Sequence, residues 1–480
     1  MLMSRKGKAN KKKAGIEFAF RAGVWYTLSS LIVKAIGIIS TPIYTRLLSP
    51  EEYGVASTFF SWYTLLITIC SLDLVISIGR AKHDFPNKLK EYTTSLQVLS
   101  FFATLGLIII GIIFFKPLVK IMELDPIVLA ILMVYLLFGP TILFNQARFR
   151  YEYRYKENIF ILFFTAISTV ILSIIFISLL DDRGYIGIAL GTAVPTIILA
   201  VFLWIKALKT KSININKEFW KYGLVISIPM LIHTLSFNLL SQSDIILINK
   251  ISGAESAGIY SLAYRYSTLI AIVITAINQA WQPWFHDKYF VGDYKEIRKQ
   301  TKKLTILGCF IGICCVAIAP EAIKVLGPQS YSVGVWVVPP VVIGIICQFL
   351  YGNYINIEIH LKNTKFASIG TLMAALLNVG LNLIFIPKYG YIAAAYSTLL
   401  CFVFLLGIHL IITRYLLKVK LYDEKFMVVS LILTIVCIYI FTLLYTYLFL
   451  RLVVLLIIIL LFCILNKDLL LRFLKNKKLF

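Results

Sequence analysis

The sequence predicts an all-α integral membrane protein of about 14 transmembrane helices. We expect two six-helix bundles, related by a parallel internal duplication, followed by two C-terminal helices. Three observations predict this fold: long apolar runs, an internal repeat, and an uneven distribution of basic residues along the chain.

The apolar runs give the number of helices. Apolar residues make up 60% of the 480 positions and charged residues 15%, whereas a soluble chain of this length needs more polar surface. A helix needs about 20 apolar residues to cross the hydrocarbon core, and the strands of a membrane barrel would be short and alternating. The expected helices are 16–45, 53–79, 93–115, 127–147, 158–180, 184–206, 219–248, 256–281, 303–320, 333–358, 366–386, 389–413, 425–448 and 450–466.

The repeat consists of three segments that recur in the same order, 204 to 209 residues downstream. A unit with an even number of helices inserts twice in the same orientation, which predicts two parallel bundles, an arrangement typical of transporters. Glycines at spacing four, Gly187 and Gly191, indicate close helix packing. The pairs are GYIGIALGT at 184–192 with GYIAAAYST at 390–398, TVILSIIFI at 169–177 with NVGLNLIFI at 378–386, and PEEYGVAS at 50–57 with AESAGIYS at 254–261.

The repeat also sets the expected domain boundaries. Helices 13 and 14 have no counterpart in the repeat and form an appended pair. The expected parts are a basic cytoplasmic tail at 1–15, an N-terminal bundle at 16–206, a cytoplasmic linker at 207–218, a C-terminal bundle at 219–413, a linker with helices 13 and 14 at 414–466, and a second basic cytoplasmic tail at 467–480.

The net charge of +24 would suit a surface that binds nucleic acid or another polyanion, but its distribution favours membrane topology. With a cytoplasmic N-terminus, and with residues within three positions of a helix end counted with the adjoining loop, 36 of the 47 Lys and Arg fall on the inner side, 8 on the outer side and 3 within helices. This asymmetry follows the positive-inside rule, so we expect no nucleic-acid partner. The longest inner loop, Phe285 to Lys303, is predicted to be either an interfacial helix or a solvated connector.

Charged residues inside helices are the sharpest chemical signal, because each costs about 3 kcal/mol at the bilayer centre unless it is paired or faces a cavity. Arg21, Lys34 and Arg265 predict a positively lined cavity that would suit phosphate or pyrophosphate, although Arg21 could instead extend to the inner headgroups. Asp73 and Asp244 could bind a coupling ion, or could pair structurally with Arg21 and Arg265.

Two further sets of polar residues are less specific. Glu358 and His360 lie at the expected inner interface, where solvation is the simpler interpretation. Amide side chains within helices could bind sugar hydroxyls or could hydrogen-bond neighbouring helices together. These amides are Asn238, Gln242, Asn278, Asn378 and Asn382.

No motif indicates an enzyme. The sequence lacks the GxxxxGK[ST] nucleotide loop, HExxH and GxSxG, and its eight cysteines lack the spacing of a metal or redox site. We therefore expect no cofactor, no metal and no catalysis.

Two segments resemble a known family. TPIYTRLLSPEEYG at 41–54 and DIILINKISGAESAGIYSLAYRY at 244–266 are similar to segments of bacterial polysaccharide-biosynthesis flippases. These flippases belong to the multidrug/oligosaccharidyl-lipid/polysaccharide exporter superfamily. The resemblance implies two six-helix bundles around a central cavity, in the bacterial cytoplasmic membrane with both termini inside. It also implies that Arg21 and Arg265 hold a diphosphate.

The resemblance further implies that the substrate is an undecaprenyl-pyrophosphate-linked oligosaccharide, moved by alternating access for O-antigen, capsule or exopolysaccharide assembly. Membrane lipids and the polymerase and ligase of the pathway are the expected partners. Two alternatives remain open. A cation-coupled multidrug antiporter of the same superfamily would favour acidic cavity residues, and a membrane enzyme of the pathway would carry a large outer loop.

Overall fold

A computed structural model describes residues 25–26, 28–209, 215–361, 363 and 365–465 of the chain. In these ranges 14 helices are long and apolar enough to cross a membrane, which confirms the predicted all-α membrane fold. Contacts divide the chain into two compact units. Unit 1 is Met1–Gly258 with Asn382–Tyr391, and unit 2 is Ile259–Leu381 with Ile392–Phe480.

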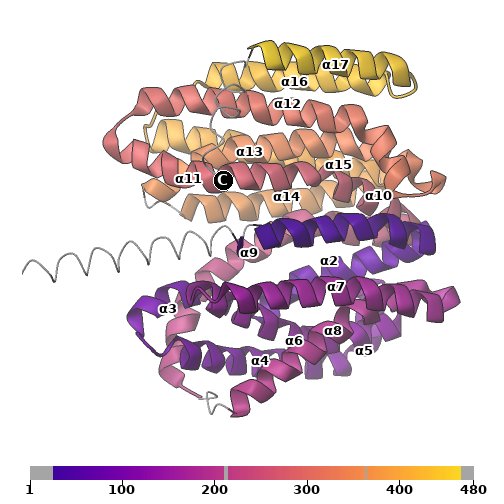
Figure 1. Ribbon diagram of the computed structural model, residues 1–480, viewed down its shortest axis with the longest axis vertical. Helices are drawn as coiled ribbons and strands as arrows, with labels where there is room; N and C mark the ends of the chain where they lie inside the picture. The colour runs from indigo at the N-terminus through magenta and orange to yellow at the C-terminus, as the bar shows by residue number, and fades with distance from the viewer. Residues whose placement is uncertain (1–24, 27, 210–214, 362, 364, 466–480) are drawn as a thin grey trace, which may run out of the picture. The chain divides into compact units, whose positions relative to one another are not determined.

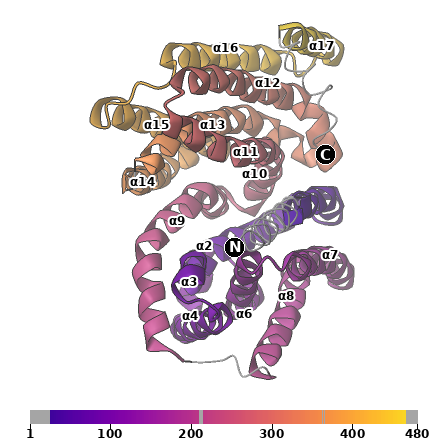
Figure 2. The same cartoon turned by 60° about the vertical axis from the view of Figure 1, so that its left-hand side comes forward.

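Unit 1 begins, in its described part, with the helix Leu28–Leu47. Its helices α7 and α8 lie side by side, and α9 lies alongside α2 and α4 (Figures 1 and 2). The further elements are α2 (Pro50–Cys70), η1 (Leu74–Ser77), α3 (Ile78–Asp84), α4 (Leu89–Ile113), α5 (Phe115–Met122), α6 (Pro126–Tyr151), α7 (Tyr155–Leu179), η2 (Asp181–Arg183), α8 (Gly184–Lys209) and α9 (Lys217–Ser252).

Unit 2 is built from helices that follow the start of α10. The helix α12 packs against α13 and α16, and α13 packs against α15. The elements are α10 (Ala254–Ser267), which begins in unit 1, then α11 (Leu269–Val291), α12 (Tyr294–Leu326), η3 (Gln329–Val337), α13 (Val338–His360), α14 (Lys365–Tyr389), α15 (Ile392–Ile411), the π-helical turn η4 (Ile412–Leu416), α16 (Glu424–Leu443) and α17 (Leu448–Leu465).

The start of α2 is fixed by local sequence. Ser49 is the N-cap and its Oγ accepts a hydrogen bond from the Glu52 amide, while Glu52 accepts one from the Ser49 amide. This reciprocal pair satisfies two amides that the first helical turn leaves without partners. Glu52 also accepts from the amide of Gly184 at 2.8 Å, so the same carboxylate joins the starts of α2 and α8.

The packing of α7 on α8 depends on two glycines. A Cβ on Gly187 would lie 2.5 Å from the Ile177 amide nitrogen, and one on Gly191 would lie 2.3 Å from the Ser173 amide nitrogen. Only a residue without a Cβ permits this approach. The predicted structural role of these two glycines is therefore confirmed.

Two expectations about helix limits are wrong. The second helix ends at Cys70 and not at 79, because Leu72 and Asp73 adopt positive φ angles of 50° and 49°. The stretch 285–303, expected to be either an interfacial helix or a solvated connector, instead holds the end of α11 and the first turns of α12. There α11 ends at Val291, Gly292 has a φ of 81°, and α12 starts at Tyr294. The first turns of α12 are rich in charged residues, so the sequence suggested a loop there.

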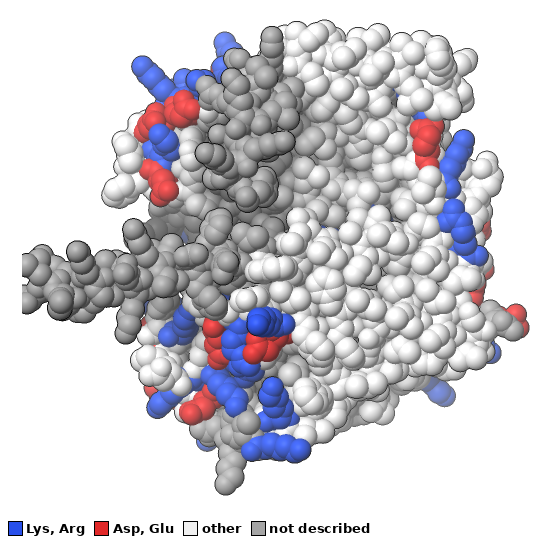
Figure 3. Space-filling model, viewed as in Figure 1, with Lys and Arg blue, Asp and Glu red and all other residues white. Residues whose placement is uncertain are grey.

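Within each unit, on the face that Figure 3 shows, charged side chains gather toward the ends of the helices and uncharged side chains lie between them. Such an uncharged stretch is what a helix that crosses hydrocarbon must present to lipid. In unit 1, contacts place α9 with the helices that precede it, whereas the repeat assigned it to the second bundle. The expected domain boundaries stay a prediction.

Candidate functional site: a charged cleft in unit 1 and a tryptophan pocket in unit 2

The break after α2 places Asp73 in a cleft of unit 1. The Asp73 amide donates to Thr68 O at 3.2 Å and to Ser71 Oγ at 3.3 Å, which closes the turn. Its Oδ2 accepts a 2.7 Å hydrogen bond from Thr234 Oγ1 of α9. Two successive non-glycine residues at positive φ cost about 1–3 kcal/mol each, so the surrounding hydrogen bonds must hold this conformation.

The cleft beside Asp73 has a volume of about 310 Å³. Arg150 and Gln146 of α6 contribute polar groups to its wall, and Thr68 of α2 contributes a hydroxyl. Arg150 makes no ion pair with any described residue. A guanidinium without an acidic partner beside a cavity suits a planar anion such as a phosphate. We call this site the Asp73 cleft.

Sequence reasoning missed Arg150, which it counted among the basic residues of an inner loop. The structure extends α6 to Tyr151 and so makes Arg150 part of a helix. Its neighbour Arg148 is more enclosed, with a hydrogen bond to Asn145 at 3.0 Å and an ion pair with Glu152 at 3.9 Å. The available signal was the basic and aromatic run RFRYEYRYK at 148–156.

The predicted basic residues occupy different surroundings. Arg21 lies outside the described residues. Lys34 is exposed on the helix Leu28–Leu47. Arg265 on α10 is half-buried, and its guanidinium has no hydrogen-bond or ion-pair partner in the described part of the chain. Their proposed contact with a diphosphate stays a prediction.

Two predicted amides and one carboxylate are wholly enclosed. Asn382 Nδ2 donates to Asp244 Oδ1 at 2.7 Å, and Asn378 Nδ2 donates to Thr398 Oγ1 at 3.0 Å. The exposed fractions are 0% for both asparagines and 1% for Asp244. This geometry fits the second of the two interpretations, in which the amides hold helices together.

The remaining predicted amides are less enclosed. Asn238 Nδ2 donates to Thr68 Oγ1 at 2.9 Å, one helical turn along α9 from the Thr234 contact with Asp73. Gln242 and Asn278 are half-buried. Asn238 therefore supports the wall of the Asp73 cleft through Thr68.

Glu358 corrects the expectation of a solvated carboxylate. It is 0% exposed, and its Oε1 lies 2.7 Å from Nδ1 of His409, which is also 0% exposed. The His409 ring stacks on Tyr351 with centroids 5.6 Å apart. His360 is half-buried, with its Nδ1 3.1 Å from Nδ1 of His286. An unsupported carboxylate in a membrane is costly, and the histidine supplies the needed partner.

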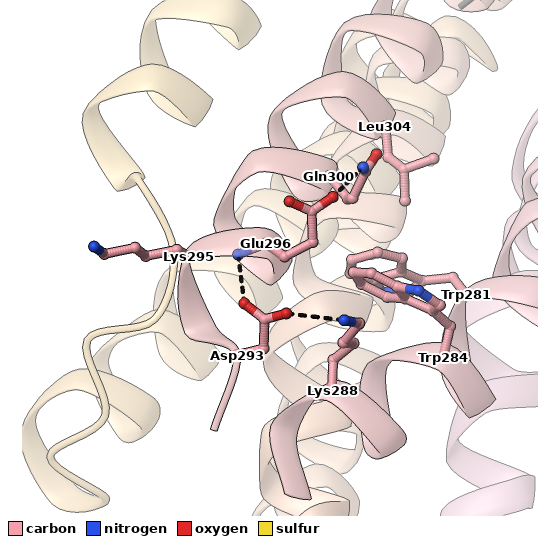
Figure 4. Close-up of a pocket in the computed structure, with 8 residues that line it drawn as sticks. All are labelled: Trp281, Trp284, Lys288, Asp293, Lys295, Glu296, Gln300 and Leu304. Carbon is pink, nitrogen blue, oxygen red and sulfur yellow. Dashed lines mark hydrogen bonds and ion pairs between the residues drawn. The ribbon is translucent and has the colours of Figure 1, made fainter. Parts of the chain in front are cut away.

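A second cavity, the tryptophan pocket, opens at the junction of α11 and α12 in unit 2 (Figure 4). Its volume is about 680 Å³. The rings of Trp281 and Trp284 stack with centroids 4.9 Å apart and planes at 29°. The pocket is lined by Trp281, Trp284, Lys288, Asp293, Lys295, Glu296, Gln300 and Leu304.

The polar groups of the tryptophan pocket are largely paired with one another. Lys288 Nζ donates to Asp293 Oδ2 at 2.8 Å, and Gln300 Nε2 donates to Glu296 Oε1 at 2.6 Å. The Lys288 ammonium holds the pKa of the Asp293 carboxyl below its usual range, so this pair is ionised at neutral pH. Lys295 points away from the indole rings (Figure 4).

The sequence profile of the polysaccharide biosynthesis protein family matches residues 20–288, more than half of the chain. The chain belongs to this family. No curated protein matches the sequence. The two segments that suggested the family, at 41–54 and 244–266, both lie inside the matched region.

Solved structures share the fold of this polysaccharide biosynthesis protein. The lipid II flippase MurJ, in an inward-closed conformation, has a TM-score of 0.74 at 13% identity, over 93% of this chain and 100% of that one. An inward-facing multidrug resistance MATE family transporter of the MOP superfamily gives 0.64 at 13% identity, over 88% and 99%. A MOP superfamily transporter from Pyrococcus furiosus gives 0.55 at 14% identity, over 88% and 97%.

The site therefore belongs to a multi-pass membrane protein with the fold of flippases and multidrug transporters. In the described ranges no group of three or more His, Cys, Asp and Glu could hold a metal ion. The chemistry that the residues offer is binding: guanidinium groups for anions, an indole pair for apolar ring faces, and buried carboxylates with hydrogen-bond partners.

Proposed function

We propose that the protein is a flippase that moves undecaprenyl-pyrophosphate-linked oligosaccharides across the bacterial cytoplasmic membrane for O-antigen, capsule or exopolysaccharide assembly. The chain belongs to the polysaccharide biosynthesis family and has a transporter fold. The observation that carries the proposal is that Arg150 and Arg265 have no acidic partner among the described residues. A pyrophosphate is a dianion or more at neutral pH, and guanidinium groups bind it by paired hydrogen bonds.

Arg21, Lys34 and Arg265 are the proposed diphosphate-binding residues. Arg150 is proposed separately, as an anion contact in the Asp73 cleft of unit 1. The mechanism is alternating access, which exposes these groups first to the cytoplasmic and then to the outer side. Asp73 is the proposed site for a coupling ion, because it is half-buried and borders a cavity. Asp244 has the structural role, because Asn382 already binds it.

Gln242, Asn238 and Asn278 are the proposed glycan contacts among the amides, because each is only half-buried. Both termini are proposed to be cytoplasmic, and the polymerase and ligase of the pathway are proposed partners. Catalysis has no part in this function, since translocation forms and breaks no covalent bond.

The test is flipping of a fluorescent undecaprenyl-pyrophosphate oligosaccharide in proteoliposomes without ATP. We expect protein-dependent transport that falls about tenfold or more in Arg265→Ala and Arg150→Ala, since a lost charge-assisted contact costs about 1.5–3 kcal/mol. Arg80→Ala is the matched control, because Arg80 is exposed and paired with Asp84. Ion-driven efflux of an organic cation, without flipping of any glycan lipid, would indicate the antiporter alternative.

A further inference from the structure

The proposed function does not use the tryptophan pocket. This open cavity of about 680 Å³ is in the size range of small-molecule sites. Five of its eight lining side chains are polar or charged. Trp281 is only 6% exposed and Trp284 is half-buried, so Trp284 is the indole that a ligand in the cavity meets.

The charge of the pocket selects the kind of ligand. Lys288 is neutralised by Asp293, and Lys295 points away from the rings (Figure 4). Glu296 and Gln300 offer further acceptor and donor atoms that already hydrogen-bond each other. With Lys288 already paired and a carboxylate in the wall, the lining does not attract a phosphate, which would need guanidinium or ammonium groups free to bind it.

The stacked indoles select the shape of the ligand. Trp281 is buried and stacks against Trp284, so the half-buried Trp284 offers one apolar ring face, and polar groups lie at its edge (Figure 4). A pyranose ring has the matching surface, since its C–H groups form an apolar face and its hydroxyls project from the rim. Aromatic side chains suit such amphipathic contacts because they combine a large apolar body with a polar tip.

We propose that the tryptophan pocket is a saccharide subsite, in which Trp284, supported from behind by Trp281, holds a neutral sugar ring of the lipid-linked cargo. Lys288, Glu296 and Gln300 exchange hydrogen bonds with its hydroxyls. This inference rests on the proposed function for the origin of the sugar, but its chemistry is independent of transport. The subsite lies on the proposed cytoplasmic side, because 6 basic residues of the inner side fall between 282 and 303.

The first experiment measures binding of soluble sugars to the purified protein in lipid nanodiscs, by saturation-transfer NMR. The probes are maltotriose, chitotriose and inorganic phosphate. We expect saturation transfer to the ring C–H protons of at least one oligosaccharide, lost in Trp284→Ala and retained in Trp284→Phe. Trp336→Ala is the matched control, because Trp336 is an exposed tryptophan elsewhere in unit 2.

The second experiment measures the KM for flipping of the glycosylated lipid. We expect Trp284→Ala to raise this KM about tenfold, the size typical of losing one aromatic stacking contact. The inhibition constant of bare undecaprenyl pyrophosphate should stay unchanged, because that competitor has no sugar. Gln300→Ala provides a second variant in the same pocket if Trp284→Ala fails to fold.

The two proposals fail in different ways. If the wild-type protein flips no glycan lipid, the proposed function is wrong, while saturation transfer from soluble sugars still supports the subsite. If the wild-type protein flips glycan lipids but Trp284→Ala and Gln300→Ala leave both the NMR signals and the KM unchanged, the subsite is overturned. Phosphate that abolishes the sugar signals, with the KM unchanged, overturns it as well.

Discussion

At the scale of single residues, the buried Glu358–His409 pair is expected to contribute strongly to the stability of the fold. Both side chains are 0% exposed. Removal of one partner leaves the other buried without its main contact, which typically costs about 3–5 kcal/mol. We predict that Glu358→Ala and His409→Ala each lower the melting temperature strongly in detergent. A thiol-reactive dye that reports exposure of the buried cysteines during heating, Cys70, Cys309, Cys347 and Cys401, provides the measurement.

Two further variants make this stability prediction specific. Glu91→Gln is the control, because Glu91 is an exposed carboxylate on α4, and its melting temperature should stay near that of the wild type. The double variant Glu358→Ala with His409→Ala should lose less than the sum of the two single losses, because it leaves neither side chain buried without its partner. Additive losses would mean that the two residues do not stabilise one another.

Asp73 allows a prediction about coupling. Asn tolerates positive φ better than other non-glycine residues, so Asp73→Asn removes the charge and preserves the turn. We predict that an imposed proton or sodium gradient accelerates flipping by the wild type and not by Asp73→Asn, whose slow downhill flipping persists. Thr234→Val is the control that removes the 2.7 Å hydrogen bond and keeps the carboxylate. Full gradient acceleration in Asp73→Asn would restrict Asp73 to a structural role.

At the scale of elements, the third pair of repeated segments, 50–57 and 254–261, makes a direct contact. Gly54 near the start of α2 and Gly258 near the start of α10 are equivalent positions in the segments at 50–57 and 254–261. A Cβ on Gly54 would lie 1.7 Å from Ala254 O, and one on Gly258 would lie 1.9 Å from Pro50 O. The repeat therefore contacts itself, backbone against backbone, through two glycines.

This contact gives a prediction with a built-in control. Gly54→Ala and Gly258→Ala should each destabilise the protein by about 1–3 kcal/mol or more, because a backbone carbonyl cannot move aside as a side chain can. Gly106→Ala, in the middle of α4 with nothing within 4 Å of a Cβ, should gain about 0.5–1 kcal/mol from helix propensity. Thermal unfolding of the three variants in one detergent provides the comparison. Equal stability in all three would contradict the close contact.

The elements also show what the sequence could predict. The number of helices follows from a local property, about 20 apolar residues in a row, and all 14 were found. The helix break at Leu72 and Asp73 is held by a hydrogen bond from Thr234, which is 161 residues away from Asp73. A local sequence pattern therefore cannot predict this break. The burial of Glu358 depends in the same way on His409.

The candidate sites were harder to predict than the helices for the same reason. Arg150 was counted as a loop residue because hydropathy ends a helix where charges begin, whereas α6 continues to Tyr151. The tryptophan pocket needs α12 to begin at Tyr294, in a stretch whose charges resemble a connector. Polar amides such as Asn378 were correctly found as polar groups inside helices. Their partners, which decide their role, come only from packing.

At the scale of the whole molecule, the positive-inside pattern predicts an orientation. The basic asymmetry favours cytoplasmic tails, which puts the connection between α14 and α15 outside and the start of α12 inside. In a variant without native cysteines, we predict that Lys388→Cys reacts in intact cells with a membrane-impermeant maleimide and that Lys299→Cys reacts only after the membrane is permeabilised. Both lysines are exposed, so access to reagent and not burial decides the result. Reversed labelling would place the tryptophan pocket on the outer face, where it would meet the sugar after translocation and could not select cargo before it.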